Sequence, residues 1–165
     1  MQRHIIGFHL DELNDWVAEL DCHHDQHTRH KPPLMSRPWV VTQEGRDSLL
    51  GATLDCVRCD RLEFPDGLHE YKRTPVFTEN SIPAGLLKDH DTKPGVWGLI
   101  HVEEGTLLYT VHHPQDHTYL LNAGDKGVVA PLMKHRVEAR GKVKFFVAFY
   151  RKHSNEGGDS GLLDT

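Results

Sequence analysis

Short apolar segments separated by turn residues dominate the pattern of hydrophobic and polar positions along the chain. Near the start, residues 4–9 (HIIGFH) and 15–20 (DWVAEL) flank the polar segment DELN, which predicts a β-hairpin. Thr42 is a typical N-cap, so TQEGRDSLLG predicts a short helix that ends at Gly51, and PWVV before it predicts a further short strand. A unit this small with so few large apolar side chains commonly needs a metal ion to stabilise it.

The pattern changes beyond residues 61–69 (RLEFPDGLH), which are typical of a linker. Seven short apolar runs follow, several with alternating polarity, and the segments KPG, EEG, HPQD, NAGDKG and RG are turn signals between them. Seven or eight short strands at this spacing predict a β-sandwich or barrel. We therefore expect a mainly β chain, with a small Cys/His unit over residues 1–63, a barrel over 64–153 and a disordered polar tail over 154–165.

Composition and charge narrow the function classes. The 165 residues suffice for one ordinary domain or two small ones, and the net charge of −5 argues against broad nucleic-acid binding, although a local basic patch leaves it open. No run approaches the roughly 18 apolar residues of a membrane helix, and the N-terminus lacks the apolar region of a signal peptide. The sequence therefore predicts a cytoplasmic protein with no membrane partner.

The three cysteines indicate a metal site. Cys56 and Cys59 form a Cys-x-x-Cys pair, and Cys22 begins the histidine-rich segment CHHDQHTRHKPP. Structural zinc sites commonly combine two such close ligand pairs. We expect a structural Zn²⁺ held by four of five candidates: Cys22, His24, His27, Cys56 and Cys59. The alternative is a redox dithiol at Cys56 and Cys59 beside a solvated loop.

A resemblance supports the first site. The pattern IIGFH…DWVAEL.C.H.QH.RH.PP…RPW…G..LDC..C, over residues 4–61, resembles a small bacterial family of uncharacterised Cys/His domains. That family usually has Cys-Gly-His where this chain has Cys22-His23-His24. The resemblance implies that His24 and His27 both belong to the motif. We expect a zinc-ribbon-like domain.

A second resemblance covers residues 71–150. It is carried by YKRTPVF (71–77), IPAGLL (82–87), HDTKPGVWG (90–98), EGTLLY (104–109), GVVAP (127–131) and HRVE (135–138). These segments resemble the cupin family at the amino terminus of tellurite-resistance protein B methyltransferases, which is also found in small stress-induced bacterial proteins. The resemblance implies a double-stranded β-helix, or jelly-roll barrel, that is often dimeric and has a pocket in its mouth.

The resemblance also implies candidate pocket residues. Metal-binding cupins use three histidines and a glutamate, and this chain retains two of the four, His90 and His135. These two histidines are consistent either with a second divalent metal ion in the barrel or with a hydrogen-bonded pair that binds no metal. Independently of the resemblance, Lys93, Tyr109 and Arg136 are candidates for an anion-binding pocket, because Lys and Arg suit oxyanions such as carboxylate. We expect the ligand pocket to be lined by His90, Lys93, Trp97, His101, Tyr109 and His135.

Three functions remain open at this point. The first is a non-catalytic or weakly catalytic stress-response protein that binds a small molecule, oxyanion or metal and carries a structural zinc. The second is a metal-dependent cupin oxygenase or isomerase that uses His90 and His135, so enzymatic activity is undecided. The third is a nucleic-acid or protein adaptor that binds through the basic stretch from Arg29 to Arg37 and forms a homodimer through the cupin.

Overall fold

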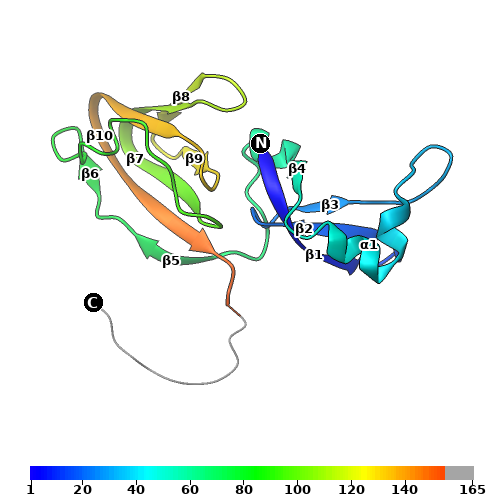
Figure 1. Ribbon diagram of the computed structural model, residues 1–165. Helices are drawn as coiled ribbons and strands as arrows, with labels where there is room; N and C mark the ends of the chain where they lie inside the picture. Colours follow the sequence, from blue (N-terminus) through cyan, green and yellow to red (C-terminus); the bar gives the residue numbers. More distant parts are fainter. Residues whose placement is uncertain (155–165) are drawn as a thin grey trace.

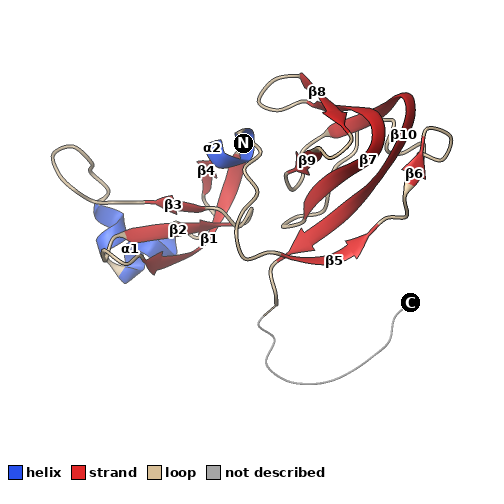
Figure 2. Cartoon of the chain, turned by 180° about the vertical axis from the view of Figure 1, so that it is seen from behind, coloured by secondary structure: helices blue, strands red, loops and turns tan. Residues whose placement is uncertain are grey.

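The computed structural model describes residues 1–154. Figures 1 and 2 show two β-rich domains side by side, with the N-terminal sheet and α1 on one side and β5 to β10 on the other. Except for Ser154, the tail expected over residues 154–165 lies outside the described residues. Among the described residues, no helix combines the length and the apolar character that crossing a membrane requires.

The N-terminal domain is built on a curled antiparallel sheet. Within residues 1–154 this sheet has four strands in the order β3-β2-β1-β4. The strands are β1 (Gln2–Leu10), β2 (Trp16–Leu20), β3 (Asp25–His27) and β4 (Thr53–Asp55). The pairing of β1 with β2 confirms the predicted hairpin.

Three short helical segments accompany this sheet. The 3₁₀ helix η1 (Pro38–Val41) and α1 (Gln43–Ser48) lie between β3 and β4, and α2 (Val57–Asp60) follows β4. Thr42 caps α1 as predicted, because its Oγ1 accepts a 3.1 Å hydrogen bond from the Gly45 amide. The expected strand at PWVV is wrong. Pro38 occupies the first helical position, where its fixed φ and missing N–H suit a helical turn that leads into α1.

The C-terminal domain is a cupin-like β domain built around two long, paired strands. These are β7 (Trp97–Val111) and β10 (His135–Arg151), which run antiparallel. In the described part of the chain, the sheet order is β5-β10-β7-β8, with β6 paired to β10 and β9 to β7. The shorter strands are β5 (His69–Arg73), β6 (Phe77–Thr78), β8 (His117–Asn122) and β9 (Lys126–Val129).

Two predicted turns are bends within strands. The segments EEG and RG were expected to separate strands, but β7 and β10 continue through Gly105 and Gly141, whose φ angles are 75° and 78°. An added Cβ at Gly105 would lie 1.9 Å from the carbonyl oxygen of Lys142. Glycine therefore lets the paired strands bend while they stay close. The first of the seven apolar runs expected to form strands, AGLLKDH (84–90), is also wrong as a strand, because this segment forms turns.

One apolar core runs through both domains. It joins Ile5 and Leu20 of the N-terminal sheet to Trp97 and Phe145 of the cupin-like domain. Polar contacts cross the same boundary, since the Arg3 guanidinium donates a 2.7 Å hydrogen bond to the carbonyl oxygen of Pro131. The N-terminal domain is therefore packed firmly against the barrel.

Candidate metal centre and barrel cavity

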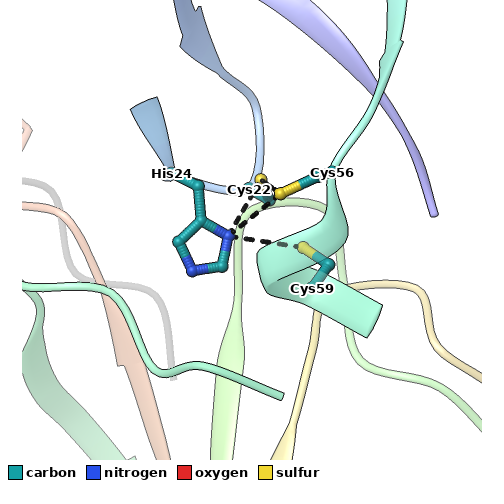
Figure 3. Close-up of side chains that lie close together, drawn as sticks. All are labelled: Cys22, His24, Cys56 and Cys59. Atoms are coloured by element: carbon teal, nitrogen blue, oxygen red, sulfur yellow. Dashed lines mark hydrogen bonds between the residues drawn. The ribbon is translucent and has the colours of Figure 1, made fainter. Parts of the chain in front are cut away.

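Four buried side chains from two distant segments meet where the domains touch. Cys22 and His24 lie in the turn between β2 and β3, Cys56 is the N-cap of α2, and Cys59 lies within α2 (Figure 3). Between the first two, His23 has a φ of 69°, in the left-handed region that favours glycine. This is the position at which the resembling family carries glycine. The turn directs Cys22 and His24 to the same side.

The spacing of the four ligand atoms fits a tetrahedral zinc ion. The Nδ1 of His24 lies 3.6 Å from Sγ of Cys22, 3.3 Å from that of Cys56 and 3.5 Å from that of Cys59. The sulfurs of Cys22 and Cys56 are 3.8 Å apart. With Zn–S bonds of about 2.3 Å and a Zn–N bond of about 2.0 Å, tetrahedral geometry gives about 3.5 Å for N···S and about 3.8 Å for S···S.

The His24 ring is oriented for metal binding by its second nitrogen. Its Nε2 donates a 2.7 Å hydrogen bond to the carbonyl oxygen of Glu63, which can only accept. The Nδ1 lone pair is therefore directed at the sulfurs, as in metal-ligating histidines generally. The Trp97 ring packs edge-on against His24, with centroids 5.2 Å apart, and closes this side of the cluster.

The cluster concentrates negative charge on sulfur. Hydrogen bonds from Cys22 and Cys59 lower the pKa of the Cys56 thiol, while the bond to Cys56 raises that of Cys22. Burial lowers the pKa of His24, but hydrogen bonds to Cys56 and Cys59 outweigh it and raise the value to about 9. Arg3 Nε donates to the sulfur of Cys59 at 3.3 Å. The site thus favours a bound cation, whether a proton or a soft metal ion.

The other candidate histidines of the loop lie elsewhere. His27, on β3, has an exposed side chain whose Nε2 is 3.0 Å from a carboxylate oxygen of Asp11. The Nδ1 of His30 accepts a hydrogen bond from the amide of Arg37. Of the five zinc candidates, the structure brings together Cys22, His24, Cys56 and Cys59, and leaves out His27.

The cupin-like domain encloses a cavity of about 250 Å³. Its wall is mainly apolar and includes Leu86, Ile100, Val129, Val137, Phe145 and Val147. His90 and His135 provide polar atoms in the same wall, together with Thr74, Asp91 and Thr92. The cavity therefore combines an apolar body with a polar region formed around the two histidines.

The two histidines of the cavity lie against each other. Their backbones form a bridge, and their ring centroids are 4.1 Å apart. Nδ1 of His90 donates to the carbonyl oxygen of Lys88 and Nδ1 of His135 to that of Met133, at 2.9 and 2.8 Å. In the neutral form of each ring, Nε2 therefore carries no hydrogen and accepts. Burial lowers the pKa of His135 to about 4, which keeps its ring neutral at physiological pH.

These two nitrogens fit a metal poorly. Three protein ligands are usual for a catalytic metal site. Within residues 1–154, the only group of three or more histidine, cysteine or carboxylate ligands close enough to share an ion is the Cys₃His cluster.

The remaining predicted pocket residues do not line this cavity. Ile100 faces the cavity, so strand alternation places Trp97 and His101 on the opposite face of β7. Trp97 packs on the metal cluster, and His101 stacks on Phe146 at 4.6 Å. Tyr109 lines a separate hollow and donates to the carbonyl oxygen of Val128, while Lys93 lines an outer hollow beside the cavity.

Sequence reasoning missed residues that carry no motif. Arg3 contacts the cluster and Glu63 orients His24 through its carbonyl oxygen, and neither is recognisable from spacing. The apolar wall of the cavity also carries no sequence motif, because most of its residues are ordinary strand residues.

Comparisons with known proteins divide the chain in the same way. Residues 6–63 match the family described as "Protein of unknown function (DUF3565)", and residues 72–147 match the TehB-like domain. The uncharacterized protein YeaR of Escherichia coli (strain K12) is 28% identical over 100 residues, which cover 53% of this chain and 84% of YeaR.

Solved structures resemble the second domain. A crystal structure of a protein from E. coli (strain K12) shares 25% identity, with a TM-score of 0.52, and covers 56% of this chain and 98% of its own. The structure of TehB from Haemophilus influenzae shares 29% identity with a TM-score of 0.46, over 53% of this chain and 32% of TehB. The chain thus consists of a DUF3565 domain, which carries the buried Cys₃His cluster, followed by a TehB-like cupin domain related to YeaR.

Proposed function

We propose that this protein binds a small, largely apolar molecule in the cavity of its cupin domain, and that a structural zinc ion in the Cys₃His cluster holds the N-terminal domain on that barrel. The observation that carries the binding function is the cavity of about 250 Å³ with His90 and His135 in its wall. Zinc supports the scaffold and takes no part in binding the molecule.

The shape and polarity of the cavity support a small ligand. Its volume equals that of about eight water molecules at liquid density. The apolar wall favours a hydrocarbon body, because burying such a body in water-free surroundings is favourable. The Nε2 atom of the neutral His135 ring can only accept a hydrogen bond, so a hydroxyl group suits this region better than a bare oxyanion.

The cluster supports a structural role for zinc. Four protein ligands leave no coordination position for water, and catalytic zinc sites keep one open. Cys22 and Cys59 have no solvent exposure, and Cys56 is 3% exposed. A buried, closed site between two domains suits an ion that stabilises the fold.

The alternative functions have weaker support. A metal-dependent oxygenase or isomerase would rely on His90 and His135 alone. A nucleic-acid adaptor would rely on the basic stretch from Arg29 to Arg37, but Arg29 and Lys31 both pair with the carboxylate of Asp15, at 2.7 and 3.7 Å. These pairs reduce the positive charge available to phosphates.

Zinc stoichiometry tests the scaffold function. We expect one zinc ion per chain in the wild-type protein and in His27→Ala, measured by elemental analysis after dialysis against a mild chelator. His24→Ala removes a ligand, so it should lose the zinc and melt at a lower temperature. Full zinc content in His24→Ala together with loss in His27→Ala would contradict the ligand assignment.

Binding of 1-hexanol tests the cavity. The alcohol combines an apolar body with a hydroxyl donor, and we expect it to shift the NMR signals of Ile100 and Val137. Val147→Phe fills the cavity and should abolish these shifts while the protein stays folded. Val147→Leu, which fills less space, should weaken binding and serves if the larger side chain impairs folding. Unchanged binding in both variants would show that the alcohol binds elsewhere.

A further inference from the structure

We propose that the ligand of this cavity is a small amphipathic carboxylate, whose apolar body lies inside the barrel and whose anionic group lies outside beside Lys72 and Lys93. The inference rests on the proposed binding function of the cavity and assigns the class of its ligand. It follows from a second hollow that adjoins the first.

The outer hollow shares a wall with the cavity. It measures about 290 Å³ and is lined by Tyr71, Lys72, Lys93 and Val96. Asp91, Thr92 and Phe149 line both spaces. The two spaces are therefore adjacent, and the proposal requires the ligand to pass from one to the other beside Phe149.

The two spaces differ in charge. The cavity wall is apolar apart from its histidine region, whereas two lysines, Lys72 and Lys93, line the outer hollow. Within residues 1–154, neither ammonium group has a carboxylate oxygen within 4.0 Å. Among the described residues, these two lysines therefore have no carboxylate partner, and an anionic ligand group would supply one.

Asp91 does not cancel this positive charge. Its carboxylate pairs with the Nζ of Lys134 at 2.8 Å, and this pairing lowers the pKa of Asp91. The shared wall thus contributes a neutralised pair. A singly charged carboxylate on an apolar body fits both spaces.

Three six-carbon probes test the inference on the full, zinc-loaded chain. Hexanoate, 1-hexanol and hexylammonium differ in charge, and the alkyl chain of hexanoate is one carbon shorter than the other two, so a longer apolar body cannot explain tighter binding of hexanoate. We expect hexanoate to bind about tenfold more tightly than 1-hexanol at low ionic strength, in NMR or calorimetric titrations. Hexylammonium should bind most weakly. The advantage of hexanoate should shrink at high salt, because exposed charges are screened.

Lysine variants locate the anionic group. Lys72→Gln and Lys93→Gln should each weaken hexanoate binding about threefold to tenfold and leave 1-hexanol binding unchanged. Lys142→Gln removes the same charge beside another hollow, near Lys144, and should change neither. Two results would overturn the carboxylate assignment: equal affinity for hexanoate and 1-hexanol, or hexanoate binding that is unchanged in Lys72→Gln and Lys93→Gln. Neither result would contradict the binding function of the cavity.

The proposed function fails in a different way. If 1-hexanol binds and Val147→Phe abolishes that binding, the cavity function stands whatever the lysine variants do. If none of the three probes binds at millimolar concentration, the cavity function and the carboxylate assignment are both wrong.

Discussion

The indole Nε1 of Trp97 donates a 2.8 Å hydrogen bond to the carbonyl oxygen of Cys22, 75 residues earlier in the chain. The first residue of β7 is thus bonded to the first residue of the metal cluster. The same indole ring packs edge-on against His24 and Phe64. The Cys₃His cluster is therefore part of the interface between the two domains.

Replacing Trp97 tests this connection. Trp97→Phe keeps an aromatic ring but leaves the buried carbonyl oxygen of Cys22 without its donor. We expect the free energy of unfolding to fall by about 1–3 kcal/mol in urea titrations, with zinc still bound. Trp39→Phe makes the same exchange at a partly exposed ring that packs on Phe8, and it should cost less. Equal costs for the two variants would contradict a specific role for the Trp97 hydrogen bond.

Arg3 offers a second test, because one guanidinium contacts both the cluster and the barrel. Its Nε donates to the Cys59 sulfur, and its Nη2 donates to the carbonyl oxygen of Pro131. Arg3→Lys keeps the charge but lacks the planar fork that makes both bonds.

We expect Arg3→Lys to lower the free energy of unfolding by about 1–3 kcal/mol and to speed amide hydrogen exchange at Met133, beside the contact. Arg58→Lys alters an exposed ion pair with Glu63 and should change neither quantity. Unaltered hydrogen exchange at Met133 in Arg3→Lys would show that the turn around Pro131 does not depend on the hydrogen bond from Arg3.

Acid should weaken the fold through His135. Burial lowers its pKa from about 6.5 to about 4. Between these two pH values, His135 binds a proton in the unfolded chain but not in the folded chain. The free energy of unfolding is therefore unaffected by His135 above pH 6.5 and declines as the pH falls towards 4. The full decline from this one group is about 3 kcal/mol at most.

His135→Asn removes this titration while its amide can still donate to Met133. The free energy of unfolding of wild type minus that of the variant, measured by urea titration at several pH values, should fall between pH 6.5 and 4. Release of a metal ion from the Cys₃His cluster at low pH would affect both proteins equally and cancel in the difference. A difference that stays constant over this range would show that His135 titrates normally in the fold.

The glycine bends give a matched pair of variants in the barrel. Gly105 and Gly141 both have positive φ, which costs a residue with a Cβ about 1–2 kcal/mol. Gly141→Ala should cost only this amount, because an added Cβ there meets no atom within 4 Å. Gly105→Ala also places its Cβ against the backbone of Lys142 and should cost clearly more in thermal unfolding. Equal costs would mean that the strand pair can move apart freely.

The sequence predicted what depends on local spacing. The Cys56–Cys59 pair, the hairpin at the N-terminus and the Thr42 cap all rest on contacts within a few residues. The choice between His24 and His27 was open, because it depends on which ring the turn at His23 directs inwards. That direction is set by the carbonyl oxygen of Glu63, 39 residues away.

The pocket was harder to predict for a related reason. Placing His101 in it required knowing which face of β7 turns inwards, and a single step along a strand reverses that face. EEG and RG are ordinary turn signals, and only the pairing of β7 with β10 makes them bends. The contacts of Arg3 and Trp97 join segments that are far apart in the chain, and no sequence motif indicates that these segments meet.

Because Trp97 covers one side of the Cys₃His cluster, the order of synthesis of these residues affects when a metal ion can bind. Cys22 and His24 leave the ribosome first, the ligand set is complete once Cys59 follows, and Trp97 is made 38 residues after Cys59. Metal can therefore be loaded onto the nascent domain before the barrel exists to cover it. In the finished molecule the ligands are buried, so exchange of the ion with cellular chelators requires the two domains to part and should be slow.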